Sequence, residues 1–498
     1  MRPVLAALAA ALFCALACGA QAAGPTATVD SGVLAGVQRG AIQIYKGIPY
    51  AAPPVGPLRW APPAPAAPWT RPRDASSFGA ICPQPKSAIP GASGAQSEDC
   101  LFLNVWTFAG ARGAPVMVWI HGGSFIFGSG GGPFYDGDAF AHDGVILVSI
   151  NYRLGALGWF AHPALTRAAA PGAPLANYGL MDQIAALQWV KRNIAAFGGD
   201  PANITVFGES AGGASVLALL STPSANGLFA RAIVESGGGW AADHSLAAAE
   251  QQGVATVTAA GLGPDATADQ LRALAPDKLS PPMTLGGVGP TTDGRLMPRS
   301  ITQTFAAGQQ LKVPLMIGSN SYEASLMAAF KITPASMLAL EPTTLRPLYP
   351  GDDATVAADL FTDSVMGAPA YWIAGQAAAR APAFLYHFSY VPTVGLKQTP
   401  GTIHGGEIPF VFADWSSLAP NVVTPQDQAM EALAHACWVS FAKTGTPACG
   451  TARWPQFQTG SQVWMEFGQT TYGPQVVARK SQYDALETTL LPRLEAAP

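Results

Sequence analysis

Short stretches of mostly apolar residues recur along the chain, and each is too short to form a buried helix. Runs of this length are typical of parallel strands that are buried on both faces. They lie at residues 116–120, 145–150, 204–207 and 313–317. Residues 180–196 and 214–220 instead repeat apolar positions at helical spacing, so we expect helices there. Strands alternating with helices predict an α/β fold with a large, mostly parallel central sheet flanked by helices.

The regions outside these elements have other patterns. A strand-like segment at residues 41–45 precedes a proline-rich stretch, residues 49–68, where proline favours extended or turn conformations. Residues 241–282 are rich in alanine with polar spacers, which indicates further helices. No internal repeat or linker-like tract divides the chain, so we expect one domain over residues 23–498.

Composition and charge exclude two classes of protein. Of the 498 residues, 49% are apolar and 12% are charged, which excludes a disordered chain. Lys and Arg number 27 against 31 Asp and Glu, a net charge of −4, and no basic cluster appears. We therefore expect no nucleic-acid partner, because phosphate binding needs a basic surface.

The first 22 residues have the pattern of a secretory signal peptide. A positive residue comes first, residues 4–17 are apolar, and Ala20-Gln21-Ala22 has the small-x-small form of a cleavage site. A membrane anchor fits less well because the apolar run is short for a span, and a lipoprotein site at Cys18 stays open. We expect cleavage near Ala22 and a secreted or periplasmic protein without a membrane span.

Cleavage there would leave four cysteines, an even number that suggests disulfides in an exported protein. They allow three pairings, of which the two local ones, Cys82–Cys100 and Cys437–Cys449, are the simplest. Buried free thiols are the alternative. The chain has no C-x-x-C motif and no Cys/His cluster, so we expect no metal site.

A candidate nucleophile follows the strand predicted at residues 204–207. That strand leads into Gly208-Glu209-Ser210-Ala211-Gly212, and a predicted helix comes next. In this setting G-x-S-x-G is typical of a sharp turn that presents a serine hydroxyl at a helix N-terminus. The alternative is a glycine-rich turn whose serine only caps the helix.

A serine nucleophile needs hydrogen-bond donors for the charge that forms on the attacked carbonyl oxygen. His121-Gly122-Gly123 directly follows a predicted strand, and glycines let backbone N–H groups approach a ligand closely. We expect the N–H groups of Gly122, Gly123 and Ala211 to form this oxyanion hole. The glycine run at residues 128–132 lacks the G-K-[ST] ending of a phosphate-binding loop, so nucleotide binding is not indicated.

Longer motifs occur in a fixed order along the chain. They are GIPYA at residues 47–51, SEDCL at 97–101, NYRLG at 151–155, NYGL at 177–180, FGGDP at 197–201 and FGESAGG at 207–213. On these motifs the chain resembles the type-B carboxylesterase/cholinesterase family of α/β-hydrolases, as a bacterial-type secreted carboxylesterase. The resemblance covers nearly all of residues 23–498. It implies the α/β-hydrolase fold, with a small N-terminal β-sheet and helical insertions over the active site, and no cofactor.

The resemblance also implies a Ser/Glu/His triad. The acid falls on Glu323, just after the strand predicted at residues 313–317, and the base on His404. From the residues alone, His404 stands among glycines on a loop, whereas Glu323 has no distinguishing signal. In this scheme His404 takes the proton of Ser210, and Glu323 orients the imidazolium. Glu209 either adds negative potential beside the histidine or is a structural carboxylate.

Further assignments come from the resemblance. Cys82–Cys100 is implied to be the family's first disulfide, and Arg59–Glu98 and Arg153–Asp182 its structural ion pairs. Cys437–Cys449 rests only on proximity in the sequence.

Departures from the cholinesterase pattern bear on the substrate. No aromatic residue lies between Cys82 and Cys100, where cholinesterases carry a tryptophan that binds choline. Leu326 and Met327 stand where cholinesterases have aromatic residues, and residues 285–289 (LGGVG) lack bulky acyl-pocket side chains. Trp240 either forms a wall of the acyl pocket or packs in the core. We expect a serine carboxylesterase that favours apolar or bulky esters over choline esters.

Glu209, Trp240, Leu326 and Met327 are thus the candidates for contact with a small-molecule ester substrate. A lipase, an amidase on the same triad and a non-catalytic binding module are the other interpretations. The sequence leaves the oligomeric state open.

Overall fold

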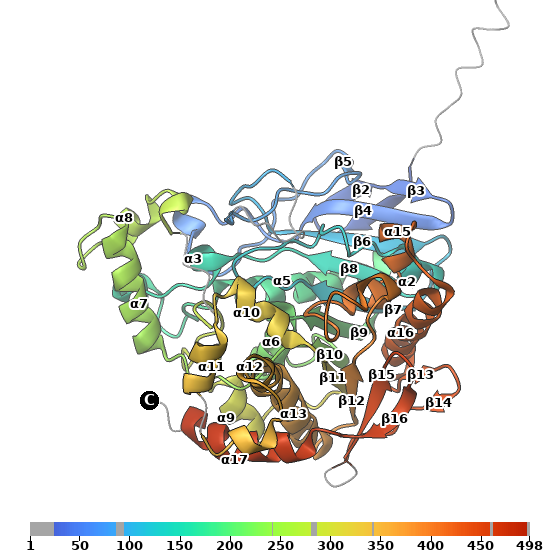
Figure 1. Cartoon of the computed structure of the whole chain (residues 1–498). Coiled ribbons are helices and arrows are strands. Elements are labelled where there is room, and N and C mark those ends of the chain that lie inside the picture. Colours follow the sequence, from blue (N-terminus) through green and yellow to red (C-terminus); the bar gives the residue numbers. More distant parts are fainter. Residues whose placement is uncertain are drawn as a thin grey trace, which may run out of the picture.

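The computed structural model describes residues 24–85, 94–241, 243–279, 286–340, 343–458 and 462–495. The predicted signal peptide, residues 1–22, lies outside the described residues, and so does Leu285. Figure 1 shows a central sheet with helices packed around it and a second, smaller sheet at the top.

The central sheet is mixed and has 11 strands, in the order β16-β15-β12-β11-β10-β9-β7-β8-β6-β4-β3. The strands from β15 to β8 are parallel, and antiparallel strands extend the sheet at both edges. Their bounds are β3 Val37–Arg39, β4 Ile42–Pro49, β6 Phe102–Phe108, β7 Ala114–Ile120, β8 Ile146–Ile150, β9 Gly199–Glu209, β10 Arg231–Glu235, β11 Leu315–Asn320, β12 Ala383–Phe388, β15 Val463–Phe467 and β16 Tyr472–Val476.

Each apolar run of the sequence is a strand in the middle of this sheet. β7 and β9 contain residues 116–120 and 204–207 and extend beyond them. β11 begins at Leu315 rather than at residue 313, because Pro314 has no N–H to donate to a neighbouring strand. The predicted α/β fold with a mostly parallel central sheet is confirmed.

Helices cover both faces of the sheet. α6 begins at Ala211, three residues before the helix predicted at 214–220, because the chain turns directly from β9 into the helix at Ser210. α5 ends at Asn193 and continues as a 3-10 turn that stops at Gly198, whose φ is 85°. The helices among the described residues are α2 Asp138–His142, α3 Gly155–Gly158, α4 Pro163–Ala168, α5 Tyr178–Asn193, α6 Ala211–Leu220, α7 Leu246–Ala259, α8 Ala268–Arg272, α9 Ile301–Ala306, α10 Leu326–Ala329, α11 Pro334–Leu340, α12 Asp353–Thr362, α13 Ala368–Ala378, α14 Ile408–Val411, α15 Trp415–Leu418, α16 Pro425–Thr444 and α17 Lys480–Glu495.

A separate three-stranded sheet of β1 (Thr26–Val29), β2 (Gly32–Ala35) and β5 (Arg73–Asp74) lies at the top of Figure 1. This is the small N-terminal sheet that the family resemblance implied. The alanine-rich residues 241–282 contain α7 and α8, which lie at the left edge of the same view.

The core has two apolar layers, one on each face of the central sheet. Alternate residues of β7 divide between them, since successive side chains of a strand point to opposite faces. Val116 and Val118 belong to the layer that includes α5 and α6, whereas Met117 and Trp119 belong to the layer that includes α16. The strand that leads to the glycine loop at residues 122–123 is therefore held from both sides.

Both local cysteine pairs are bonded. Cys82 is joined to Cys100, and Cys437 of α16 is joined to Cys449 of the short strand β13 (Ala448–Cys449). Across the described ranges, no helix combines the length and the apolar character needed to cross a membrane.

Candidate active site

Ser210 stands at the sharp turn between β9 and α6. Its φ of 56° and ψ of −123° are rare for a residue with a side chain, and its N–H donates to the carbonyl oxygen of Glu235 at 2.9 Å. The flanking positions have no room for a side chain. A Cβ on Gly212 would lie 1.9 Å from Ile120 O, and one on Gly208 would lie 2.6 Å from the same oxygen. Crowding against β7 thus explains the G-x-S-x-G pattern.

The glycine loop after β7 lies against this turn. A Cβ on Gly122 would lie 2.8 Å from Glu209 Oε2 and 3.0 Å from Ser210 Cβ. No hydrogen bond from the backbone N–H of Gly122, Gly123 or Ala211 is found among the described residues. Gly122 and Ala211 therefore lie beside the Ser210 side chain with potential donors, and Gly123 follows Gly122 in the same loop.

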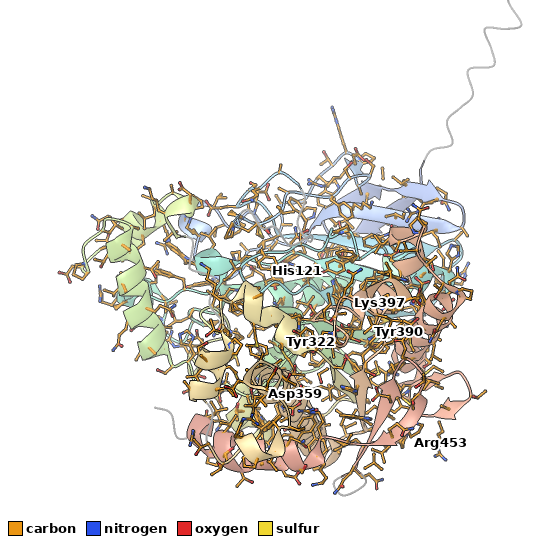
Figure 2. The ribbon with its side chains drawn as sticks, viewed as in Figure 1. His121, Tyr322, Asp359, Tyr390, Lys397 and Arg453 are labelled. Atoms are coloured by element: carbon orange, nitrogen blue, oxygen red, sulfur yellow. A yellow bond between two sulfur atoms is a disulfide. The ribbon has the colours of Figure 1, made fainter. Side chains whose placement is uncertain are left out.

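His121, which directly precedes these glycines, is held in place by contacts with Tyr152. Its ring stacks on Tyr152 at a centroid distance of 4.5 Å, and Tyr152 Oη donates to His121 O at 2.9 Å. Burial lowers the pKa of His121 to about 4, so its ring is neutral. Figure 2 shows His121 near the centre of the molecule.

The predicted acid and base are in contact. His404 Nδ1 lies 2.6 Å from Glu323 Oε2, although the two residues come from separate loops. Glu323 is fully buried, and its other oxygen accepts from Ser236 Oγ at 2.5 Å and from the N–H of Asn320 at 2.7 Å. The N–H of His404 donates to Ser325 Oγ at 2.9 Å. These bonds fix the ring so that Nε2 points away from Glu323.

Nε2 of His404 faces a second carboxylate, because Glu209 Oε1 lies 3.0 Å from it. Burial raises the pKa of Glu209 to about 7, against the opposing effect of His404. Burial alone would lower the pKa of His404, but the carboxylates of Glu209 and Glu323 outweigh it and raise that pKa. Glu209, one of our candidates for substrate contact, does not line the cavity and lies against the histidine instead.

Two more buried acids lie near the triad, and the sequence reasoning missed both. Glu235 accepts from Trp438 Nε1 at 2.7 Å, and burial raises its pKa to about 8. Glu407 accepts a hydrogen bond from Asn320 Nδ2, and burial together with neighbouring acids raises its pKa well above the ordinary value. Both shifts favour the protonated, uncharged form of the carboxyl group. Glu407 has one sequence signal, its place three residues after His404, whereas Glu235 ends β10, a strand that the sequence analysis did not predict.

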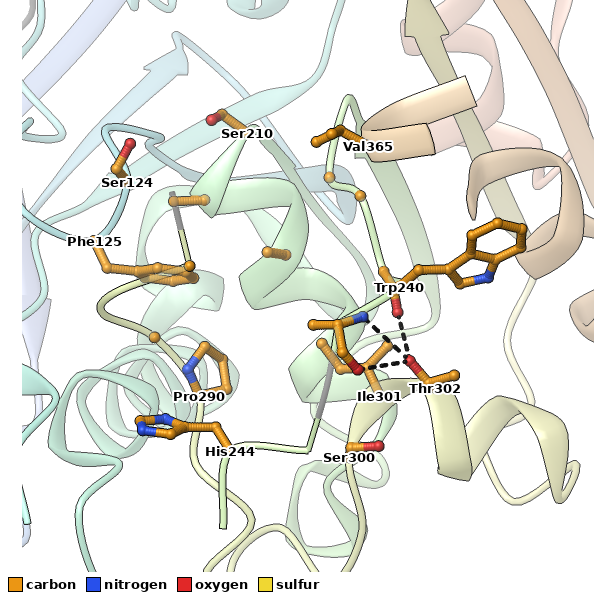
Figure 3. Close-up of a pocket in the computed structure, with 18 of the residues that line it drawn as sticks. Ser124, Phe125, Ser210, Trp240, His244, Pro290, Ser300, Ile301, Thr302 and Val365 are labelled. Atoms are coloured by element: carbon orange, nitrogen blue, oxygen red, sulfur yellow. Dashed lines mark hydrogen bonds between the residues drawn. The ribbon is translucent and has the colours of Figure 1, made fainter. Parts of the chain in front are cut away.

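A cavity of about 350 Å³ opens beside Ser210. Figure 3 shows Ser210 at its upper end, with Phe125 on one side and Val365 on the other. Its walls are mainly apolar and include glycines in place of side chains, among them Gly238, Gly239 and Gly289. No hydrogen bond from Ser210 Oγ to another described residue is found, so the hydroxyl is free to face this space.

The structure separates the remaining candidates for substrate contact. Trp240 and Leu326 line the cavity. Trp240 also packs edge-on against Trp372, with ring centroids 6.2 Å apart, so it forms a wall and is part of the core. Met327 points into the core with 8% exposure and does not line the cavity, because neighbouring helix positions face different directions.

The implied ion pairs are also in place. Arg153 Nε lies 2.8 Å from Asp182 Oδ2 in the core, and Arg59 pairs with Glu98. Over the described ranges, no group of three or more His, Cys, Asp or Glu residues could hold a metal ion.

The fold and site define an α/β-hydrolase, with a sharp strand-to-helix turn at a serine beside a glycine loop and a Glu–His pair. A family model described as "Carboxylesterase family" matches residues 23–345 and 350–486. The chain therefore belongs to the carboxylesterase family, and it is a carboxylic ester hydrolase.

Individual relatives agree with this. The chain is 36% identical over 472 residues to the fumonisin B1 esterase of Sphingopyxis macrogoltabida, covering 88% of this chain and 85% of that protein. It is 36% identical over 468 residues to the para-nitrobenzyl esterase of Bacillus subtilis (strain 168), covering 86% and 92%. A solved structure of a PNB esterase matches it with a TM-score of 0.79 and 32% identity, covering 92% of this chain and 99% of that one.

Proposed function

We propose that the protein is a serine carboxylesterase that works through an acyl-enzyme intermediate on Ser210. The observation that carries this proposal is the 2.6 Å contact between His404 Nδ1 and Glu323 Oε2 beside the strained Ser210 turn. A buried carboxylate on Nδ1 keeps the imidazole in the tautomer whose Nε2 accepts a proton. Hydrogen bonds between nucleophile and base often tighten only when substrate is bound, so the Nε2–Glu209 contact describes the free enzyme.

In the first half of the reaction, Ser210 Oγ attacks the ester carbonyl carbon while His404 Nε2 takes the hydroxyl proton. The carbonyl oxygen becomes an oxyanion that accepts hydrogen bonds from the N–H groups of Gly122, Gly123 and Ala211. The bond to the alcohol then breaks, and His404 returns the proton to the departing alkoxide. Glu323 and Glu209 stabilise the imidazolium that exists between these steps.

In the second half, water attacks the acyl-enzyme and His404 takes a proton from it. Collapse of the second tetrahedral intermediate releases the acid and restores Ser210. Burial raises the pKa values of Glu235 and Glu407 and so disfavours their charged forms, and the negative charge at the histidine comes chiefly from Glu323 and Glu209.

The substrate preference we propose is for apolar or bulky esters over choline esters. The cavity walls described here include Leu326, Trp240, Phe125 and several glycines, and they present no carboxylate to a quaternary ammonium group. Relatives named for fumonisin B1, para-nitrobenzyl and cocaine esters support a broad range of ester substrates. Leu285, which precedes the cavity residue Gly286 in the sequence, lies outside the described residues.

We also propose that residues 1–22 direct export, which leaves one catalytic domain, residues 23–498, in the periplasm or outside the cell. Two disulfides support an oxidising compartment.

The test is hydrolysis of p-nitrophenyl esters with acyl chains of two to about sixteen carbons. We expect wild type to be active and Ser210→Ala to lose at least about a thousandfold in kcat, while the exposed Ser224→Ala retains activity. An organophosphate ester should label Ser210, as read by mass spectrometry of the peptide. Equal rates for wild type and Ser210→Ala, with no labelling, would refute the mechanism.

A further inference from the structure

One wall of the cavity is a π-helical turn, Asp363–Gly367, between α12 and α13. Ser364, Val365 and Met366 of this turn line the cavity. Turns of this kind are rare and occur frequently at functional sites. In Figure 3, Val365 stands across the cavity from Phe125. The shape of the cavity therefore depends on where this irregular segment is held.

The turn packs against the segments that carry the triad. A Cβ on Gly238 would lie 3.2 Å from Val365 O, so the turn contacts the glycine run after β10. Thr362, just before the turn, accepts a hydrogen bond at Oγ1 from the N–H of Ala324, which follows the triad acid, at 3.2 Å. A shift of the turn would change the wall of the cavity next to Ser210.

A charged side chain from a distant part of the sequence holds the turn in place. Asp363 is fully buried, and its Oδ2 accepts from Arg479 Nε at 2.7 Å and from Tyr349 Oη at 2.9 Å. Arg479 comes 116 residues later, from the segment just before α17. A Cβ on Gly367, at the end of the turn, would lie 2.5 Å from Tyr483 Oη of α17. The C-terminal segment thus contacts both ends of the turn.

We propose that Arg479 is a positioning residue for substrate selectivity. Its ion pair with Asp363 sets the position of the π-helical turn, and through it the fit of the larger acyl groups that fill the cavity. The inference rests on the proposed function, because it concerns the same cavity. Arg479 touches no reacting atom. A small acyl group stays near Ser210 and does not need the wall, whereas a longer one gains its binding energy from it.

The same guanidinium offers a matched control. Arg479 Nη1 also lies 3.4 Å from Asp359 Oδ2, on α12 and outside the turn. Asp359 is partly exposed, and Figure 2 shows it among the helices at the lower centre of the molecule. Asp359→Asn removes the charge from this second contact and leaves the ion pair with Asp363 intact.

The experiment compares p-nitrophenyl acetate with p-nitrophenyl octanoate in Arg479→Met, Arg479→Lys, Tyr349→Phe and Asp359→Asn. We expect the octanoate-to-acetate ratio of kcat/KM to fall about tenfold in Arg479→Met, chiefly through KM for octanoate. Arg479→Lys should restore part of the ratio, Tyr349→Phe should lower it about threefold, and Asp359→Asn should leave it unchanged. Backbone hydrogen exchange of Asp363–Gly367, measured without substrate, should rise in Arg479→Met.

Equal losses on both esters, or an unchanged ratio with only a lower Tm, would overturn the inference. If Arg479→Met does not fold, Tyr349→Phe decides, since it keeps the ion pair and removes one hydrogen bond. If wild type hydrolysed neither ester, the proposed function would fail, and the exchange measurement would decide alone. Unchanged exchange of the turn in Arg479→Met would then overturn the positioning role.

Discussion

His404 lies between two carboxylates, and this arrangement determines the pH dependence that we expect. Burial alone would lower its pKa, but Glu209, 3.0 Å from Nε2, and Glu323, 2.6 Å from Nδ1, raise it. His404 must be neutral to accept the proton of Ser210, so activity should appear as pH rises through this pKa.

We expect Glu209→Gln to move the acidic limb of the kcat/KM profile to lower pH by about one pH unit. Loss of one negative neighbour lowers the pKa of His404, so the neutral imidazole persists at lower pH. On the plateau the variant should be about tenfold slower, because the imidazolium in the transition state loses a partner. Because the pKa of His404 is raised to about 10, rates from pH 5 to about 11 on one p-nitrophenyl ester, corrected for hydrolysis without enzyme, measure both effects.

A second Glu–His pair supplies the control. His387 Nδ1 lies 2.9 Å from Glu466 Oε2, and neither residue lines the cavity. Glu466→Gln should therefore leave the acidic limb in place. The role assigned to Glu209 is contradicted if the acidic limb of the kcat/KM profile moves equally in both variants. It is also contradicted if the acidic limb does not move in Glu209→Gln.

Gly122→Ala tests the oxyanion loop. The new Cβ would meet Glu209 Oε2 at 2.8 Å and Ser210 Cβ at 3.0 Å, so the loop must shift away from the nucleophile. We expect kcat to fall about 100-fold or more, with a smaller change in KM, as on loss of one oxyanion donor. Gly263→Ala, where a Cβ meets no atom within 4 Å, should match wild type. Full activity in Gly122→Ala would count against the assigned donors.

At the level of single residues, the sequence predicts positions where the backbone is too crowded to accept a side chain. A Cβ has no room at three positions, which are Gly208, Gly212 and Gly122. This requirement for glycine is visible in the sequence as the glycine motifs around Ser210. Glu323 has no local pattern and was found only through the family resemblance. Glu235 was missed because its setting depends on Trp438, 203 residues away in the chain.

Among the elements, the buried strands were predictable and the irregular ones were not. β8 and β11 are buried along their whole length because helices cover both faces of the sheet, and most of their residues are therefore apolar. β3 is fully exposed and three residues long, so it has no apolar run to detect. The π-helical turn Asp363–Gly367 continues two helices without a break in polarity, and an extra residue in a turn has no sequence signal.

We expect the disulfide that joins α16 to β13 to stabilise the fold without contributing to catalysis. Cys437 and Cys449 are 12 residues apart, and neither lines the cavity. Removing the cross-link in Cys437→Ala/Cys449→Ala should lower the free energy of unfolding by about 3 kcal/mol, since the unfolded chain gains freedom. The kcat on p-nitrophenyl acetate should remain that of wild type. Denaturant unfolding and steady-state assays measure the two quantities, and a loss of kcat without a loss of stability would contradict this account.

For the whole molecule, the buried acids link stability to pH. Burial raises the pKa of Glu235 to about 8, that of Glu209 to about 7 and that of Asp363 to about 6, whereas the unfolded chain has values of 4.5 for Glu and 3.8 for Asp. The folded state therefore holds more protons than the unfolded state between about pH 4 and 8. Its free energy of unfolding should fall as pH rises through this range. His121 acts in the opposite sense below pH 6.5, since burial lowers its pKa to about 4.

Above pH 6.5 the unfolded histidines have lost their protons, so the buried carboxyl groups and His404, whose pKa is raised in the folded protein, determine the trend. Glu235→Gln should weaken it. Glutamine cannot ionise, and its side-chain oxygen can still accept from Trp438 Nε1, which lies 2.7 Å from Glu235 Oε1. We expect the fall in Tm between about pH 6.5 and 8.5 to be smaller in Glu235→Gln than in wild type, as measured by calorimetry. Asp352→Asn is the control, because Asp352 is an exposed cap of α12 whose pKa is lowered and which stays ionised throughout this range. Its Tm curve should run parallel to that of wild type. If the curve of Glu235→Gln is also parallel, Glu235 is already ionised in the folded protein at pH 6.5, and the charge balance around His404 must include it.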